Sequence, residues 1–406
     1  MQVVILHYCA AFLPVLARNG SYEHFTWETA LSNSPFFLLM DGSSAVYLFF
    51  VMSGFVLAPS FSCATAPGLS LAAKRAARLL LPVLAACCVA VALYFLFPSA
   101  LADAVAQSRS DWLAMFSSKS LTAFSIAKDA FLNSMLTGYD SSSIFRGLSF
   151  LPDILQPPAI GRSLNPPTWT LHVEFWGSLL LIAVALLRRK LDGYRFWLAF
   201  VAIAIAVGAT HFALFLLGFA IYQIRGRLLA ITGVAWSTVG AAIVLVGLYI
   251  CLRKDVPVLV EGMNLIRSLP ILAEANDILA QSQIGAALVF IGAMICVPIR
   301  ALLSRPALQW LGKVSFSVYL LHFPIILTVG CAIFVALAPM SYLAASLVAA
   351  GVGTAATLLA AQWFERVIDR PAVQISRRFA VSNGRMSRKR RSPGALGDEP
   401  QRIPAE

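Results

Sequence analysis

The sequence predicts an all-α protein, a polytopic membrane bundle of about ten transmembrane helices with both termini in the cytoplasm. Of its 406 residues, 59% are hydrophobic and 12% are charged, and the mean hydropathy is +0.79. Soluble domains carry about 25% charged residues, so the composition excludes a soluble fold. Apolar runs of about 20 residues, long enough to cross a bilayer, recur along the chain. Lys and Arg are distributed unevenly between these runs.

The expected membrane spans follow the apolar runs in order. They are residues 1–17, 43–62, 79–98, 168–187, 194–210, 211–224, 228–250, 278–299, 314–336 and 341–363. The sixth span is short, and its boundary with the fifth falls at Thr210-His211. The first run lacks a basic segment and a clear small-residue cleavage site, so we interpret it as a retained helix rather than a signal peptide.

The basic residues orient this bundle. With a cytoplasmic N-terminus, the inner segments hold 22 Lys and Arg and the outer segments hold 9, which is the bias expected of cytoplasmic loops. The net charge of +12 therefore reflects topology, and we expect no nucleic-acid partner. Residues 1–375 form one membrane domain, in which residues 99–167 are the largest outer loop. Residues 376–406 form a basic, disordered tail that lies against anionic lipid headgroups.

Glu174 is the first candidate functional residue, because it lies inside the apolar run that follows Trp169. A charge at that depth costs about 2.5–3.5 kcal/mol on insertion scales, so it is expected to face a protein or water-filled interior. Thr170, Glu174 and Ser178 share one helical face by their i, i+4 spacing. The alternative is a structural glutamate that pairs with an Arg or Lys of another helix.

Two histidines lie within other expected spans. His7 is a proton acceptor usable near pH 7, and the alternative is a core histidine that is hydrogen-bonded to a carbonyl. His322 falls near the middle of the ninth span and shares a face with Ser315 and Tyr319. This polar stripe is either functional or purely structural.

Arg75 and Arg78 are spaced i, i+3 at the cytoplasmic edge of the third span, so they can face one phosphate group together. A topological anchor is the alternative. In the second span, Ser53 offers a hydroxyl and Gly54 permits close helix approach, which packing alone also explains. The seven cysteines show no metal-binding or disulfide spacing, so we expect no metal.

Together these segments carry a resemblance that none of them establishes alone. In chain order they are LFFVMSGF (48–55), RAAR (75–78), PPTWTLHVE (166–174), WLGKVSFSVYLLHFP (310–324) and FERVIDRPA (364–372). They resemble the successive signatures of the membrane acyltransferase-3 family, on that family's ten-helix frame. The resemblance implies transfer of an acetyl or succinyl group from cytoplasmic acyl-CoA to a glycan, a lipid-linked glycan or another hydroxyl acceptor. It also implies the plasma (inner) membrane of a bacterium.

The resemblance also assigns roles to residues. It implies that His7 is the essential first-helix histidine and general base, and that Arg75 and Arg78 hold the acyl-CoA phosphates. Glu174 is expected to orient the base or to bind acceptor hydroxyls, with an acyl-histidine intermediate left open. His322 is implied as a further catalytic residue, and the expected substrate contacts are Trp169, Tyr319 and Ser53. The family has an Arg about eleven positions before its first-helix histidine, whereas His7 has six residues before it. Either the natural chain starts upstream or this Arg is absent.

Two other classes of function remain open from the residues. Buried His and Glu side chains also mark proton-coupled transporters, although the chain shows no inverted repeat and no matching pair of broken helices. A lipid-linked sugar transferase is expected to show an acidic motif in its first outer loop, and Asp41 and Glu28 are too unspecific to provide one. Membrane lipids are a partner under each of these functions.

Overall fold

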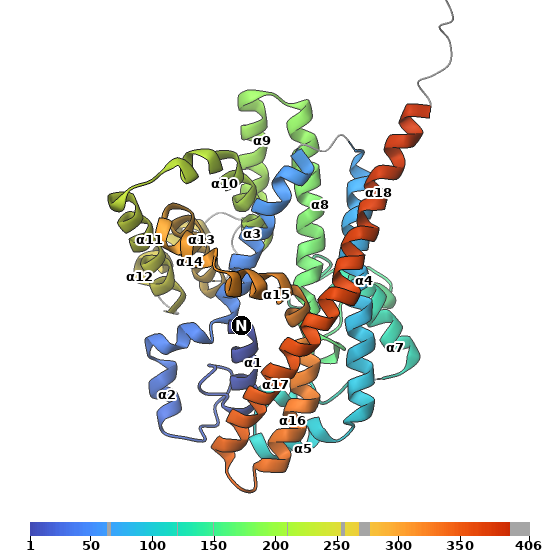
Figure 1. Cartoon of the computed structure of the whole chain (residues 1–406), viewed down its shortest axis with the longest axis vertical. Coiled ribbons are helices and arrows are strands. Elements are labelled where there is room, and N and C mark those ends of the chain that lie inside the picture. Colours follow the sequence, from blue (N-terminus) through green and yellow to red (C-terminus); the bar gives the residue numbers. More distant parts are fainter. Residues whose placement is uncertain are drawn as a thin grey trace, which may run out of the picture.

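The structure is a computed structural model that describes residues 1–62, 66–119, 121–148, 150–208, 210–252, 256–267 and 277–389. Every regular element in these ranges is helical (Figure 1). The α-helices are α1 (Gln2–Phe12), α2 (Trp27–Ser32), α3 (Gly42–Ser62), α4 (Gly68–Leu96), α5 (Ala100–Ser108), α6 (Asp111–Ala114), α7 (Ala123–Lys128), α8 (Trp169–Lys190), α9 (Gly193–Ala206), α10 (Phe212–Ala230), α11 (Val234–Leu252), α12 (Pro257–Arg267), α13 (Asp277–Ile295), α14 (Val297–Leu303), α15 (Pro306–Ile325), α16 (Cys331–Leu337), α17 (Tyr342–Phe364) and α18 (Arg370–Lys389). Short 3-10 segments are η1 (Pro35–Leu39), η3 (Asp153–Leu155), η4 (Ile160–Arg162) and η5 (Pro166–Thr168), and π-helical segments are η2 (Asp129–Thr137), η7 (Ile326–Gly330) and η8 (Glu365–Asp369).

Within the described ranges, seven helical runs are long and apolar enough to cross a membrane. They are Gly42–Ser62, Gly68–Leu96, Pro166–Lys190, Phe212–Ala230, Val234–Leu252, Pro306–Leu337 and Tyr342–Phe379. The expected count of ten is therefore not confirmed. Helices α1 and α9 are apolar but shorter, and α13 with α14 forms a pair bent by 95°. The bend coincides with Pro298 at the start of α14, where proline removes a helix amide donor.

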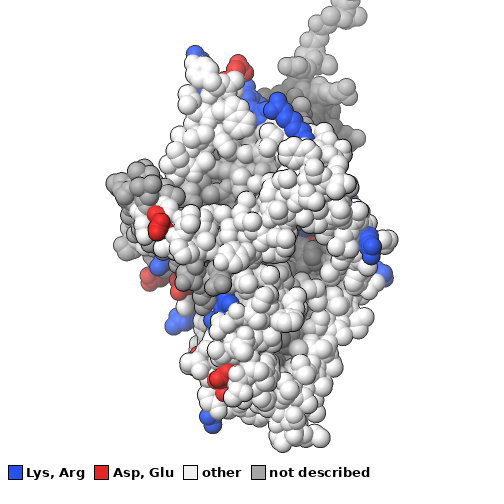
Figure 2. Space-filling model, turned by 90° about the vertical axis from the view of Figure 1, so that its left-hand side faces the viewer, with Lys and Arg blue, Asp and Glu red and all other residues white. Residues whose placement is uncertain are grey.

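The surface of the bundle is that of a protein in contact with lipid. Most of the face in Figure 2 carries no charged side chain, and the helices expose many large apolar residues, such as Phe95 on α4 and Leu359 on α17. Since lipid solvates these side chains, their exposure carries no penalty in a membrane. The structure thus confirms an all-helical, multi-pass membrane protein.

Helices α8 and α15 form the centre of the bundle. In the apolar windows of Pro166–Lys190 and Pro306–Leu337, 67% of the residues are buried, whereas the other spans are 22–39% buried. Three polar contacts join α15 to α8 and to the residues just before α8. Asn165 Nδ2 donates to the Leu320 carbonyl at 2.7 Å, the Thr170 hydroxyl donates to the Tyr319 hydroxyl at 2.9 Å, and the Tyr319 hydroxyl donates to the Pro167 carbonyl at 2.9 Å. Such contacts in membranes contribute about 0.6 kcal/mol each on average. Side chains on these two helices are therefore held in fixed positions.

Two sequence boundaries differ from expectation. Helix α4 begins at Gly68 rather than near residue 79, because Arg75 and Arg78 lie within the helix and pair with carboxylates of α8 and η8. The tail expected to be disordered from residue 376 instead continues as α18 to Lys389. This helix packs along α4, where the Ser70 hydroxyl donates to the Phe379 carbonyl at 2.7 Å. Residues 390–406 lie outside the described ranges.

Helices α3 and α10 are in close contact through two glycines. A Cβ added at Gly54 would lie 2.2 Å from the Phe215 carbonyl oxygen, and one added at Gly218 would lie 2.1 Å from that of Val51. Neither backbone can move without separating the helices. The expected packing role of Gly54 is thus present, and Gly218 is its partner on α10.

We expect Gly218→Ala to lower the apparent melting temperature of the purified protein in detergent, because overpacking typically costs about 1–3 kcal/mol. Gly226→Ala is the matched control, since it lies on the same helix and a Cβ there meets nothing within 4 Å. Equal melting temperatures for the two variants would show that α3 and α10 are not packed as described.

Candidate functional site

His7 and His322 meet where α1 crosses α15. His7 Nδ1 lies 3.0 Å from His322 Nε2, and the two rings are nearly parallel, with an interplanar angle of 3°. His322 is completely buried, whereas His7 is partly exposed. The sequence placed these residues on separate helices, and the structure joins them in one hydrogen-bonded pair.

The surrounding carbonyls fix the tautomer of both rings. His322 Nδ1 lies 2.8 Å from the Tyr319 carbonyl and 3.1 Å from the Val318 carbonyl, and a carbonyl only accepts hydrogen bonds. In the neutral pair, His322 Nδ1 therefore carries the proton, and its Nε2 accepts from His7 Nδ1–H. His7 Nε2 is left with a lone pair and has no hydrogen-bond partner among the described residues. This is the arrangement of a base oriented by a second group.

Aromatic rings hold the His7 imidazole from two sides. Trp112 stacks on it with ring centroids 5.4 Å apart, and Phe323 meets it edge-on at 5.0 Å. Trp112 comes from α6 in the segment between α4 and α8, so this segment covers the histidine pair. The sequence does not distinguish Trp112 or Phe323 as site residues, since aromatic residues are common in apolar segments.

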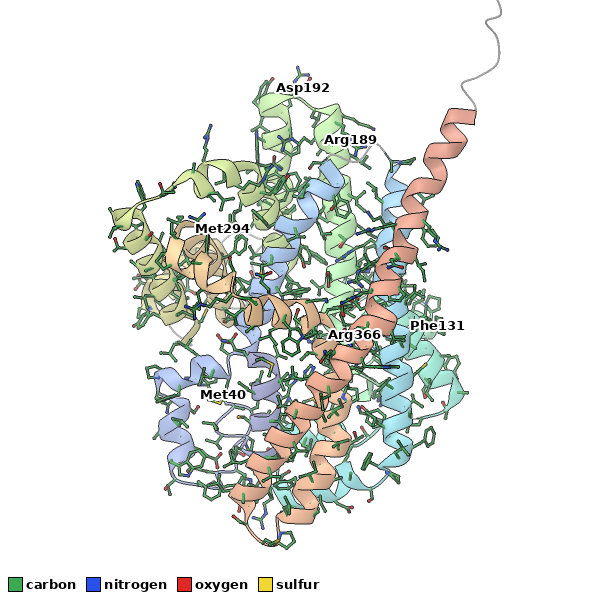
Figure 3. All side chains as sticks on the ribbon, in the orientation of Figure 1. Met40, Phe131, Arg189, Asp192, Met294 and Arg366 are labelled. Atoms are coloured by element: carbon green, nitrogen blue, oxygen red, sulfur yellow. The ribbon has the colours of Figure 1, made fainter. Side chains whose placement is uncertain are left out.

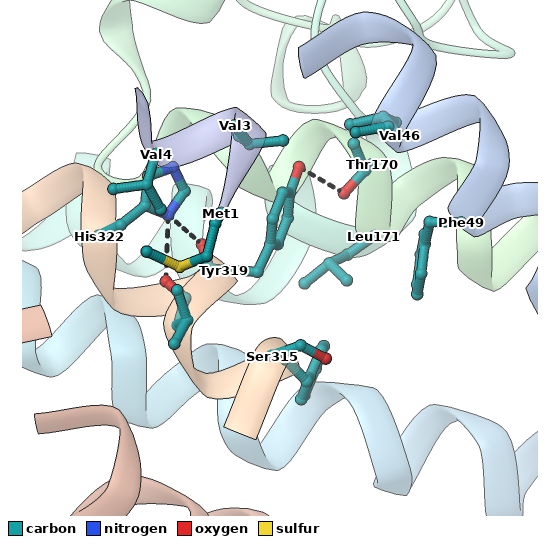
Figure 4. A pocket seen from close by; sticks show the side chains of 13 residues that line it. Met1, Val3, Val4, Val46, Phe49, Thr170, Leu171, Ser315, Tyr319 and His322 are labelled. Atoms are coloured by element: carbon teal, nitrogen blue, oxygen red, sulfur yellow. Dashed lines mark hydrogen bonds between the residues drawn. The ribbon is translucent and has the colours of Figure 1, made fainter. Parts of the chain in front are cut away.

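Three cavities adjoin one another along this region. An apolar cavity of about 210 Å³ has His322, Tyr319, Thr170 and Ser315 in its wall (Figure 4), and we call it the inner cavity. A middle cavity of about 220 Å³ is lined by His7, Trp112 and Trp169. An outer cavity of about 530 Å³ is lined by Trp169, Asp41 and His211.

Shared wall residues connect the three cavities. Tyr319 and Val46 line both the inner and middle cavities, and Trp169 and Ser43 line both the middle and outer ones. The histidine pair lies between the first two, with His322 in one wall and His7 in the next. Chemical groups that enter from opposite sides would therefore meet at His7.

The segment between α4 and α8 fixes the start of α8 and hence Trp169. Tyr139 is fully buried, and its hydroxyl donates to Asp129 at 2.9 Å and lies 3.2 Å from the Thr168 hydroxyl. The other oxygen of Asp129 accepts the Leu164 amide at 2.8 Å. Asp129 is outside the spans, and burial raises the pKa of its carboxyl while the hydrogen bond from the Leu164 amide lowers it. This network holds the PPTW segment against the histidine pair.

Glu174 does not lie at the histidine pair. Its Oε1 pairs with Arg75 Nη2, and Arg75 Nε donates to Ser178 Oγ at 2.8 Å. The side chains of Arg75 and Glu174 are 13% and 7% exposed, so this is a buried ion pair between α4 and α8. Glu174 therefore makes the contact expected of a structural glutamate, which pairs with an Arg of another helix. The residue that is hydrogen-bonded to His7 is His322 and not Glu174.

Arg78 has a different partner from Arg75. Its Nη1 lies 2.5 Å from Asp369 of η8, and its guanidinium lies 5.2 Å from the centre of the Phe316 ring. The two arginines, expected to face one anion together, are thus held by separate carboxylates. These contacts occupy two of the five N–H groups of Arg75 and one of those of Arg78.

The remaining expected contacts fall into two groups. Tyr319 and Trp169 line the cavities beside His7. Ser53 lies one turn beyond Phe49 on α3, and it does not line these three cavities, whereas Phe49 lines the inner one. In the described part of the chain, no group of three or more His, Cys, Asp and Glu is arranged to hold a metal ion.

Comparison with known proteins gives one match. The family model described as an acyltransferase domain matches residues 1–366, which confirms the family suggested by the five segments. No curated protein and no solved structure matches the chain.

We expect Glu174→Gln to reduce the yield of folded protein and its melting temperature, because removing one partner of a buried ion pair typically costs about 3–5 kcal/mol. The double variant Arg75→Gln/Glu174→Gln should recover most of this loss, since neither charge is then left alone. Glu261→Gln, at an exposed carboxylate on α12, is the control. Size-exclusion chromatography in detergent, run before and after heating through a series of temperatures, measures both quantities. Unchanged stability in Glu174→Gln would remove the structural role of the pair.

Proposed function

The chain belongs to the acyltransferase-3 family, and on this premise we propose that it transfers an acyl group from cytoplasmic acyl-CoA to an acceptor hydroxyl. The donor is acetyl-CoA or succinyl-CoA, and the acceptor is a glycan, a lipid-linked glycan or a related hydroxyl compound outside the cytoplasm. The membrane is the plasma membrane of a bacterium. One observation carries this proposal: His7 presents an unprotonated Nε2 between adjoining cavities.

The proposed orientation has ten membrane segments with both termini inside. The seven long spans, the bent pair α13 and α14, and the shorter helices α1 and α9 supply the ten segments. In Figure 3 Arg189 and Asp192 lie at the end of the bundle toward which α18 extends, and Met40 lies toward the other end. Because Lys and Arg concentrate at the first end, it faces the cytoplasm.

The donor is proposed to enter from the cytoplasmic end. The N–H groups of Arg75 and Arg78 that remain outside their ion pairs bind phosphate oxygens of acyl-CoA, as planar guanidinium groups do well. The pantetheine arm follows the apolar inner cavity, which ends at His322 and Tyr319. The thioester then reaches His7 from this side, while the acceptor approaches through the middle cavity.

The proposed chemistry needs one base. His7 Nε2 removes the proton from the acceptor hydroxyl as its oxygen attacks the thioester carbonyl carbon. The C–O bond forms and the C–S bond breaks, and the imidazolium of His7 returns its proton to the CoA thiolate. His322 acts as a positioning residue, because it accepts the His7 Nδ1–H and keeps Nε2 free for this transfer. General-base catalysis of this kind contributes about 10²- to 10⁴-fold in rate.

For topology, we expect reporters fused at Lys190 to read cytoplasmic and reporters inserted at Ser142 to read outside. Alkaline phosphatase and green fluorescent protein fusions report the two sides in a bacterial host. A cytoplasmic signal at Ser142 would contradict the ten-segment orientation.

For activity, we expect His7→Gln to lose about 10²-fold or more of the acyl transfer rate, because glutamine keeps hydrogen bonding but accepts no proton. The assay follows release of free CoA from labelled acetyl-CoA by purified protein in nanodiscs. His24→Gln is the matched control, since His24 lies outside the three cavities and contacts Ser108 and Tyr342.

Two results would contradict this assignment. Full turnover in His7→Gln would reduce His7 to a hydrogen-bonding role and move the base to His322. No release of CoA by the wild-type protein, together with coupled solute uptake, would indicate a transporter instead.

A further inference from the structure

The helical element formed by α7 and η2 has its polar side buried and its apolar side exposed. Asp129, Asn133 and Thr137 follow one another at i, i+4 spacing, and all three are buried. Phe124 and Phe131, in contrast, are 66% and 54% exposed. A helix that faces water has the opposite arrangement, with its apolar stripe against the core. Polar side chains that face the protein interior are instead typical of helices surrounded by lipid.

The buried polar side makes its hydrogen bonds within the protein. Asn133 Nδ2 donates to Asp129 Oδ1 at 3.1 Å, and the Thr137 hydroxyl donates to Asn133 Oδ1 at 3.1 Å. The Tyr139 hydroxyl also donates to Asp129 Oδ1, at 2.9 Å. Polar groups at membrane depth must be paired in this way, because hydrocarbon offers no hydrogen-bond partner. The side chains of Asp129, Asn133 and Thr137 therefore do not depend on water.

Side chains of α8 provide donors for carbonyls near the end of η2. Trp176 Nε1 donates to the Leu136 carbonyl at 3.0 Å, and His172 Nδ1 lies 3.2 Å from the Met135 carbonyl. Because a carbonyl only accepts hydrogen bonds, His172 Nδ1 is the donor in the second contact. The last carbonyls of a helix lack partners within the helix, and water commonly supplies them in soluble proteins. At η2 a buried membrane helix supplies them instead.

η2 packs along two membrane helices rather than beyond their ends. Ala130 shares one core cluster with Val83 and Cys87, which lie in the middle of the apolar part of α4, residues 79–96. Trp176, which contacts the end of η2, is about 10 Å along the axis from the start of α8. Figure 1 shows α7 beside α4, and Figure 3 shows Phe131 at the outer edge of the bundle. The element thus lies at the depth of apolar helix segments.

The exposed side of the element belongs to a surface already in contact with lipid. Helix α4, on which η2 packs, exposes Phe95 to 66%, the same fraction as Phe124. The basic residue Lys128 does not interrupt this apolar side, because its Nζ donates to the Asp153 carbonyl at 3.2 Å. Long lysine side chains reach polar groups in this way while their apolar stems remain beside hydrocarbon.

We propose that α7 and η2 are embedded in the bilayer, with acyl chains of membrane lipids covering Phe124 and Phe131. The element does not cross the membrane, because the chain enters it after the end of α4 and leaves it before the start of α8. Residues expected to stand in an aqueous outer loop are thereby placed within the hydrocarbon. The proposal concerns the position of this element, and it does not rest on the proposed acyl transfer.

The test is photo-cross-linking of the full chain in nanodiscs of dioleoyl phosphatidylcholine. The photoreactive amino acid p-benzoylphenylalanine replaces one phenylalanine at a time, at position 124 or 131, and bonds on illumination to C–H groups that it touches. Position 95 is the matched lipid-facing control, because Phe95 and Phe124 are equally exposed. Position 103 is the aqueous control, because Asp103 is an exposed carboxylate on α5. Mass spectrometry of the protein measures the fraction that carries a lipid.

We expect lipid adducts at positions 124 and 131 in a yield within about twofold of that at position 95 and about tenfold or more above that at position 103, because a ring in hydrocarbon touches acyl chains. Yields at 124 and 131 as low as that at 103 would place the element in water and overturn the inference. Cross-links that join two chains, seen as a dimer on a denaturing gel, would show that a second copy covers this side and would overturn it as well.

Discussion

The hydrogen bond between His7 and His322 is the contact on which the candidate site depends. It links the short helix α1 to the buried helix α15. Its direction is fixed, because backbone carbonyls hold the proton on His322 Nδ1, so that His7 Nδ1–H is the donor and His322 Nε2 is the acceptor. The bond therefore has two effects: it positions α1 within the bundle, and it leaves His7 with a lone pair. A single protonation pattern thus connects the packing of the helices to the chemistry that we propose.

Placing a polar pair inside a membrane protein requires a rigid surrounding, and α8 and α15 provide it. Their residues are the most buried of the long spans, and polar contacts between them keep Tyr319 and Trp169 in the cavity walls. The buried pair of Arg75 and Glu174 fixes α4 against α8 along the helix, and the Asp129–Tyr139 network fixes the residues before α8. The site is thus held from both ends of α8.

The arrangement of the cavities suggests how one protein can handle two unlike substrates. The inner cavity is apolar, as the proposed acyl-pantetheine arm requires, whereas the outer cavity has polar side chains such as Asp41 and Arg18 in its wall. Under the proposed function neither substrate needs to cross the bilayer, because only the acyl group would pass the histidine pair.

The sequence by itself determined the class of the protein, the family and the helical segments, because hydropathy and local motifs are properties of short stretches of chain. It also identified His7, His322, Arg75, Arg78 and Glu174 as residues of interest. Their partners were decided only by the tertiary structure: Glu174 pairs with Arg75, Arg78 pairs with Asp369, and His322 is hydrogen-bonded to His7. Asp41 and His211 lie far apart in the sequence, and packing brings them to one cavity. Spacing along a helix fixes which residues share a face, but which helix lies opposite that face depends on the packing of the whole bundle.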